Sequence, residues 1–142
     1  MNASRVAERG LHVIDALGGR LHDFRLAFDK ASRAHAGVGH ACIHRDPGHV
    51  VEGVLYQLAD AAEILKMDPF ERAPWNYGRD AVAVQTEQGT VWAWTYFANA
   101  AVLAHGLKPS RAYLDHLLAG EAFLSSAYHA RLARWPTGEE DG

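Results

Sequence analysis

The feature that most constrains this chain is a series of short segments in which apolar residues recur at every second position. Phe24, Leu26 and Phe28 alternate with their neighbours in this way, which predicts a half-buried strand. Further strands are expected at residues 38–43, 50–58, 80–86 and 91–98. Short, alternating strands joined by tight turns suit a small closed or nearly closed barrel.

Glycines punctuate these segments. Glu87-Gln-Gly-Thr90 stands between the last two strands and predicts a hairpin connection, with its Gly available for a positive φ. Gly53, inside the segment 50–58, indicates a bulge or a close approach of two backbones. Gly18-Gly19 is more simply interpreted as a turn before a strand.

Helices are expected mainly after the strands. Asp60 is a good N-cap for a short helix that must end at Pro69. Ser110 is a good N-cap for a helix running to about Gly120, and Ser126 for a last helix that runs through Arg134. Strands that come first, with helices packed on them, predict the α+β class.

Length and composition predict one globular domain, residues 1–135, followed by a flexible tail at 136–142. The net charge is −3 and basic residues do not cluster, so nucleic-acid binding is not expected. No apolar run is long enough to span a bilayer, and the first ten residues lack the apolar segment of a signal peptide. The single cysteine, Cys42, predicts a buried free thiol in a reducing, cytoplasmic setting.

The nine histidines do not form a recognisable metal motif. His40 and His44 share a face if their segment is extended, but they have no Cys or acidic residue beside them in a ligand pattern. There is also no Gly-x-Ser-x-Gly elbow, Walker loop or dinucleotide fingerprint. We therefore expect neither a metal nor an organic cofactor.

Glu71 is the strongest candidate for chemistry. It stands on a short loop between apolar segments, where burial can raise a carboxyl pKa enough for proton transfer near neutral pH. By residue type alone, an exposed loop glutamate is the simpler interpretation. Tyr77, Tyr96 and Tyr113 are each most simply packing residues, but together they would suit an amphipathic pocket with polar tips.

Several short motifs, in a fixed order, resemble the gamma-glutamylcyclotransferase family over residues 2–134. The motifs are Gly53-Val-Leu-Tyr-Gln-Leu58, Asp68-Pro-Phe-Glu71, Tyr77-Gly-Arg79, Thr95-Tyr96 and Gly106-Leu-Lys-Pro-Ser110-Arg-Ala-Tyr113-Leu. The resemblance implies an α+β fold, a small mixed and mostly antiparallel β-barrel with flanking helices. It also implies that Glu71 transfers protons and that Tyr77, Tyr96 and Tyr113 line the substrate pocket.

The resemblance implies a reaction on a small γ-glutamyl substrate, without a cofactor. The γ-glutamyl group cyclises, releasing 5-oxoproline and an amine or an amino acid. Two alternatives remain open: a non-catalytic binding or interaction protein of the same fold, and an enzyme acting on a γ-glutamylated amine from a specialised pathway.

The chain departs from the family at its start. Family members begin with an apolar strand and a Tyr-Gly-Ser-Asn turn, whereas residues 1–11 resemble the segment directly after that turn. We expect either that the natural start lies upstream of Met1 or that this is a shortened relative. A barrel without that strand has open edges, so we expect a homodimer paired through an open sheet edge, a gap filled by the N-terminal segment, or poor solubility.

Overall fold

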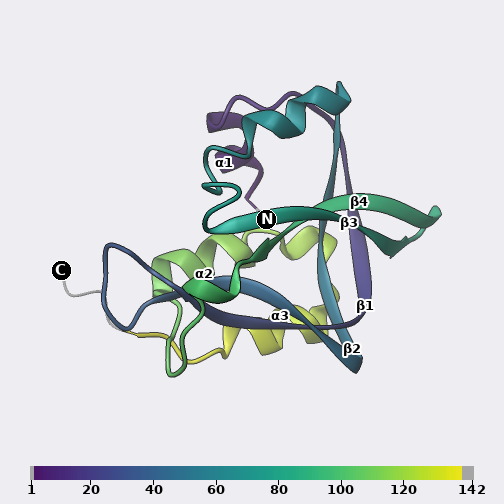
Figure 1. Cartoon of the computed structure of the whole chain (residues 1–142). Helices are drawn as coiled ribbons and strands as arrows, with labels where there is room; N and C mark the ends of the chain where they lie inside the picture. The colour runs from purple at the N-terminus through teal and green to yellow at the C-terminus, as the bar shows by residue number, and fades with distance from the viewer. Residues whose placement is uncertain (1, 139–142) are drawn as a thin grey trace.

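The computed structural model describes residues 2–138 and contains a sheet, three α-helices and three short 3-10 helices (Figure 1). In chain order the elements are α1 (Ala3–Glu8), β1 (Val13–Ala31), β2 (Gly39–Leu58), η1 (Ala61–Lys66), β3 (Tyr77–Thr86), β4 (Gly89–Ala98), η2 (Ala100–Val102), α2 (Arg111–Leu118), η3 (Glu121–Phe123) and α3 (Ser126–Ala133). None of the helices described is both long enough and apolar enough to cross a membrane.

The long hairpin of β1 and β2 dominates the fold, and it bends so that its two halves run in different directions (Figure 1). Register shifts lie between His22 and Phe24 and between Ala27 and Lys30. Such bulges bend the bulged strand and increase its twist. The strands expected at 38–43 and 50–58 are therefore two parts of one strand, because residues 46–49 form the irregularity in β2 opposite Asp23 without ending the strand.

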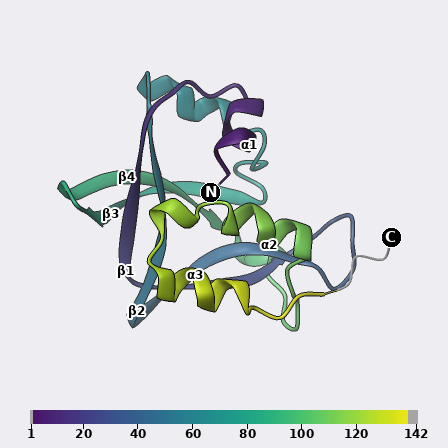
Figure 2. The ribbon, with the colours of Figure 1, turned by 180° about the vertical axis from the view of Figure 1, so that it is seen from behind.

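The predicted α+β class is confirmed, but the closed barrel is not. The described sheet has the order β2-β1-β3-β4 and all its pairings are antiparallel, so β2 and β4 are edges. The two hairpins cross, and β1 meets β3 in register only at the pair Arg20 and Gln85 (Figures 1 and 2). Because the hairpins cross, β1 and β3 lie side by side over too few residues to form the continuous hydrogen-bonded ladder that a closed barrel requires.

Part of the β2 edge is covered by the same chain. The Gly39 N–H donates to the Lys108 carbonyl at 2.9 Å, and Val38 and Lys108 form a parallel bridge. Covering an edge strand in this way removes unpaired backbone groups from solvent. Pairing between two copies of the chain through the remaining edge stays a prediction.

Two apolar clusters hold the fold together. Phe28, Leu114, Tyr128 and Leu132 form one, where α2 and α3 cover one half of the bent hairpin (Figure 2). Leu21, Phe24 and Val84 form the other, between the two crossing hairpins. Each half of the bent hairpin is therefore covered by a different part of the chain.

The expected turn and caps form with small corrections. Gly89 has the positive φ, +100°, expected of the β3–β4 turn. Ser110 Oγ accepts from the Tyr113 N–H as predicted, but Ser125, not Ser126, caps the last helix. The helix after Asp60 is a 3-10 helix capped by that aspartate.

The predicted flexible tail is described only as far as Gly138. The Gly138 N–H donates to the Pro109 carbonyl at 3.0 Å. The rest of the predicted tail, residues 139–142, lies outside the described residues.

The interpretation of Gly18-Gly19 as a turn is wrong, because both lie inside β1. A Cβ on Gly18 would lie 2.6 Å from the backbone oxygen of Phe123, and one on Gly19 would lie 2.6 Å from Val84 Cγ1. The two glycines let neighbouring elements approach β1 closely.

We predict that Gly18→Ala lowers the free energy of unfolding by about 1–3 kcal/mol, because its methyl group meets a backbone oxygen that cannot easily move. Urea denaturation would measure the loss. Gly78→Ala is the matched control, since none of the described atoms outside its chain neighbours lies within 4 Å of its Cβ position. Equal effects of the two substitutions would contradict the close approach at Gly18.

Candidate active site

A cleft of about 1150 Å³ is lined by α1, both ends of the β1–β2 hairpin, η1 and the loop after it, the β3–β4 hairpin and α2. All four residues predicted from the sequence line it: Glu71, Tyr77, Tyr96 and Tyr113. Tyr77 begins β3, Tyr96 lies in β4 and Tyr113 lies in the first turn of α2. The fold therefore brings these residues to one cleft from distant points of the sequence, while their roles stay predictions.

Glu71 lies on the loop between η1 and β3, and it is not the exposed loop residue that its type alone suggests. Its side chain is 23% exposed, and its Oε1 lies 3.5 Å from Arg9 Nη1. Burial raises the pKa of the Glu71 carboxyl, and the Arg9 guanidinium opposes that rise. Arg9 in turn lies over the Phe70 ring, 5.1 Å from its centroid. A carboxyl balanced in this way can change its charge more readily near neutral pH than an exposed one.

The hydroxyls of Tyr77 and Tyr113 both bind the backbone of Ala41 in β2. Tyr77 donates to the Ala41 carbonyl at 3.0 Å, and Tyr113 accepts from the Ala41 N–H at 3.1 Å. Burial raises the pKa of both phenols, so both stay protonated at neutral pH. These bonds satisfy backbone groups of an edge strand and hold the two rings in the wall of the cleft.

Tyr96 belongs to a separate network that ties the Glu71 loop to the β3–β4 hairpin. Its hydroxyl donates to Asp68 Oδ1 at 2.6 Å. Arg79 donates to both oxygens of the same carboxylate, at 2.8 and 3.2 Å. The hydrogen bonds from Arg79 and Tyr96 lower the pKa of Asp68, so it stays ionised. Because Asp68 precedes Glu71 by three residues, this network sets the position of the loop.

Cationic groups line the cleft around Glu71. Lys30 is only 5% exposed, and its ammonium lies 5.8 Å from the centroid of the Tyr77 ring. Burial lowers the pKa of Lys30, with Arg72 and Arg33 acting in the same direction and Glu71 opposing them. Arg5 and Arg9 line the same cleft from α1 and its C-terminal end. A cleft with this charge suits a ligand that carries a carboxylate.

His40 also lines the cleft, with its ring 4.9 Å from that of Tyr113. Burial lowers the pKa of His40, and the charges of Lys30 and Arg5 lower it further, which favours the neutral imidazole. His40 and Lys30 are register partners across the β1–β2 hairpin. The hairpin thus contributes one neutral and one cationic group to the cleft.

Sequence reasoning did not identify Arg9, Lys30 or His40 as site residues. Asp68 and Arg79 stand in the motifs that carried the family resemblance, so a signal for them was present. Lys30 and His40 are far from Glu71 in sequence, and only the pairing across the hairpin places them there.

The family described as "Gamma-glutamyl cyclotransferase, AIG2-like" matches residues 6–116. No curated protein matches the chain in a sequence search.

Solved structures share the fold. One described as a gamma-glutamyl cyclotransferase aligns with a TM-score of 0.83 at 23% identity, covering 99% of this chain and 85% of that one. An uncharacterized protein from Homo sapiens aligns with a TM-score of 0.83 at 23% identity and coverage of 99% and 85%. YkqA from Bacillus subtilis aligns with a TM-score of 0.79 at 18% identity, covering 96% of this chain and 52% of that one.

We predict that Asp68→Asn loosens the loop that carries Glu71, because it weakens the bonds from Arg79 and Tyr96. A hydrogen bond to a charged group contributes about 1.5–3 kcal/mol, so amide exchange across residues 67–76 should accelerate roughly tenfold. Hydrogen–deuterium exchange would measure it. Asp80→Asn is the control, an exposed aspartate of β3 that bonds to its neighbour Ala81. Unchanged exchange in Asp68→Asn would show that the network does not hold the loop.

Proposed function

Because the chain belongs to the AIG2-like gamma-glutamyl cyclotransferase family, we propose that it cyclises the γ-glutamyl group of a small substrate. The products are 5-oxoproline and the released amine or amino acid. The observation that carries this proposal is the position of Glu71, a half-buried carboxylate in a cleft that Tyr77, Tyr96 and Tyr113 also line.

The reaction is an intramolecular acyl transfer. The substrate's α-ammonium loses a proton, and the free amine attacks the γ-carbonyl carbon to form the ring C–N bond. The attacking nitrogen, which now carries two hydrogens, loses a second proton and becomes the ring N–H. The C–N bond to the leaving amine breaks as that amine takes up a proton. Because nucleophile and carbonyl belong to one molecule, the cleft has only to hold the substrate in a folded conformation.

In this proposal Glu71 takes the first proton and later protonates the leaving amine, while the second proton of the attacking nitrogen passes to solvent. As a carboxylate it accepts the proton of the α-ammonium, and as a carboxylic acid it donates that proton to the leaving amine. One group can do both only if neither form is strongly favoured. Burial raises the pKa of Glu71, and the positive charge of Arg9 limits that rise. This balance supports the role in both proton transfers.

The other lining residues position the substrate. Lys30 and Arg9 supply positive charge for the substrate's α-carboxylate, and they lie on the same cleft as Glu71. Tyr77 and Tyr113 have hydroxyls bound to Ala41, so they offer mainly their ring faces to the folded substrate. A rigid wall of this kind favours the compact conformation needed for ring closure.

We predict that Glu71→Gln lowers the rate of 5-oxoproline release by at least about 10²–10⁴, the usual contribution of a general acid–base group. Chromatographic detection of 5-oxoproline from γ-glutamyl substrates would measure it. Because the folded-state pKa of Glu71 is raised, its ionised form disfavours folding above that pKa. At neutral pH the variant's melting temperature should therefore be unchanged or higher.

Glu87→Gln, at the exposed tip of the β3–β4 hairpin, is the matched control and should keep full activity. Near-normal turnover by Glu71→Gln would exclude Glu71 as the proton-transferring group. Substrate binding without turnover by the unaltered protein would instead favour a non-catalytic binding protein of this fold.

A second prediction concerns pH. The first step needs Glu71 ionised, so kcat/KM should fall as pH decreases through its folded-state pKa, which lies above the ordinary 4.5. Arg9→Gln removes the charge that opposes the rise and should move this acid limb to higher pH. Arg111→Gln, which changes an exposed arginine paired with Asp115 on α2, should leave the limb in place. A limb that moves equally in both variants, or in neither, would contradict the pairing of Arg9 with Glu71.

A further inference from the structure

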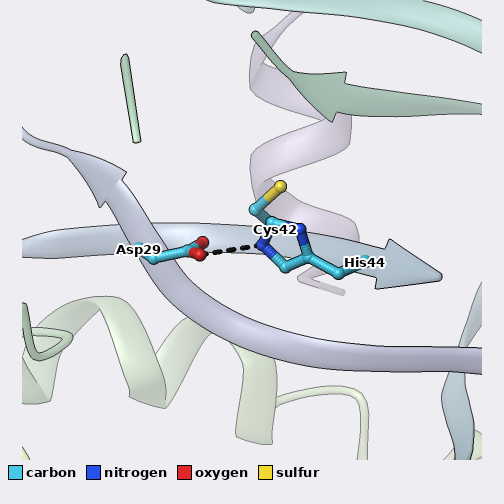
Figure 3. Close-up of side chains that lie close together, drawn as sticks. All are labelled: Asp29, Cys42 and His44. Carbon is cyan, nitrogen blue, oxygen red and sulfur yellow. Dashed lines mark hydrogen bonds and ion pairs between the residues drawn. The ribbon is translucent and has the colours of Figure 1, made fainter. Parts of the chain in front are cut away.

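A second group of reactive side chains lies outside the residues that line the cleft. Asp29 reaches from β1 toward Cys42 and His44 on β2 (Figure 3). One donor atom from each residue, a carboxylate oxygen, a sulfur and an imidazole nitrogen, lies within 4.8 Å of the other two. Cys42 and His44 are two positions apart in an extended strand, so their side chains share one face.

The carboxylate of Asp29 is only half satisfied. Its Oδ2 lies 2.8 Å from His44 Nε2. Its Oδ1 is buried and has no hydrogen-bond partner among the described residues. Buried polar atoms are nearly always paired with protein, water or an ion, so this oxygen indicates a missing partner.

Cys42 is also without a strong polar partner among the described residues. It is 4% exposed, and its Sγ donates to the adjacent Ile43 carbonyl at 3.6 Å, a weak contact. His44 and Asp29 are 24% and 30% exposed, so the group is open to solvent on their side. Arg25, the register partner of His44 on β1, is a cation near the group. Its Nε lies 3.5 Å from Asp46 Oδ2, so its ion pair is with Asp46 and not with Asp29.

We propose that Asp29, Cys42 and His44 bind a Zn²⁺ ion, with a water molecule in the fourth position. A thiolate, an imidazole and a carboxylate are the donors that Zn²⁺ takes in proteins. Cys42 binds as a thiolate and releases its proton to solvent. The site is separate from the proposed cyclotransferase chemistry and does not depend on it.

The distances fit this ion with small movements. In a tetrahedral site with metal–ligand bonds of about 2.0–2.3 Å, neighbouring donors lie roughly 3.3–3.6 Å apart. His44 Nε2 and Asp29 Oδ2, at 2.8 Å, would separate slightly as the ion replaces the proton between them, and the water on the ion would donate to Asp29 Oδ1. The sulfur would move inward by on the order of 1 Å, within reach of a side-chain rotation.

Other His–carboxylate pairs in the chain provide a comparison. His49 lies 3.3 Å from Asp46, also on β2, but both are more exposed than Cys42. Neither belongs to a described group of three or more donor residues close enough to hold a metal ion. His49 therefore serves as a control: it is a histidine paired with an aspartate, as His44 is, but it has no third donor residue beside it among the described residues.

The test is metal binding by the full chain. Zn²⁺ added to metal-free protein should remain at one equivalent per chain after dialysis and should raise the melting temperature. Co²⁺ in its place should produce the near-ultraviolet charge-transfer bands of a cobalt–thiolate bond. Absence of those bands in the unaltered protein would overturn the proposal whatever the variants do.

Variants assign the ligands. Cys42→Ala should abolish the charge-transfer bands, and His44→Gln should weaken Zn²⁺ binding by more than ~100-fold, because even outer partners of a ligand contribute 10–100-fold. His49→Gln should bind as the unaltered protein does. Far-ultraviolet circular dichroism would check that each variant is folded. Retained stoichiometric binding in folded Cys42→Ala or His44→Gln would also overturn the site.

Discussion

The bend in the β1–β2 hairpin is the constraint on which the rest of the structure depends. It arises at register shifts, where extra residues in one strand of the pair break the regular ladder. One half of the hairpin then packs on α2 and α3, while the other crosses the β3–β4 hairpin (Figures 1 and 2). The shift between Ala27 and Lys30 lies beside both groups of functional interest, Lys30 in the cleft and Asp29 in the cluster with Cys42 and His44.

The cleft owes its shape to polar groups that would otherwise be unsatisfied. Ala41 lies on an edge strand, and its N–H and carbonyl are bonded by the hydroxyls of Tyr113 and Tyr77. Two aromatic rings are thereby held against the cleft by main-chain bonds that do not depend on a ligand. The Asp68 network uses charge instead, fastening the Glu71 loop to β3 and β4. Both devices order the candidate site without a ligand, and such preorganisation reduces the entropy that any ligand would lose on binding.

At Glu71 and Lys30, burial and the attraction of nearby opposite charges act on the pKa in opposite directions. Burial raises the pKa of Glu71 and lowers that of Lys30, so it disfavours the charged form of each group. Their mutual attraction acts the other way, as does that of Arg9 on Glu71. Such a balance leaves the protonation of the carboxyl sensitive to its surroundings, whereas the ion pair of Asp68 and Arg79 keeps its charge. The residue that we propose to exchange protons, Glu71, and the residue that anchors its loop, Asp68, thus have different electrostatic settings.

The sequence by itself determined the local elements. The alternation around Phe24–Phe28, the turn at Gly89 and the caps Asp60 and Ser110 are short-range signals, and the structure contains each of them. Motif order likewise pointed to the family and to Glu71. Tertiary structure decided that residues 38–43 and 50–58 are one strand, that the described sheet is open, and that Lys30 and His40 line the same cleft as Glu71. It also brought Asp29 to Cys42 and His44. These arrangements depend on bulges and on pairing between residues distant in sequence, which local periodicity does not encode.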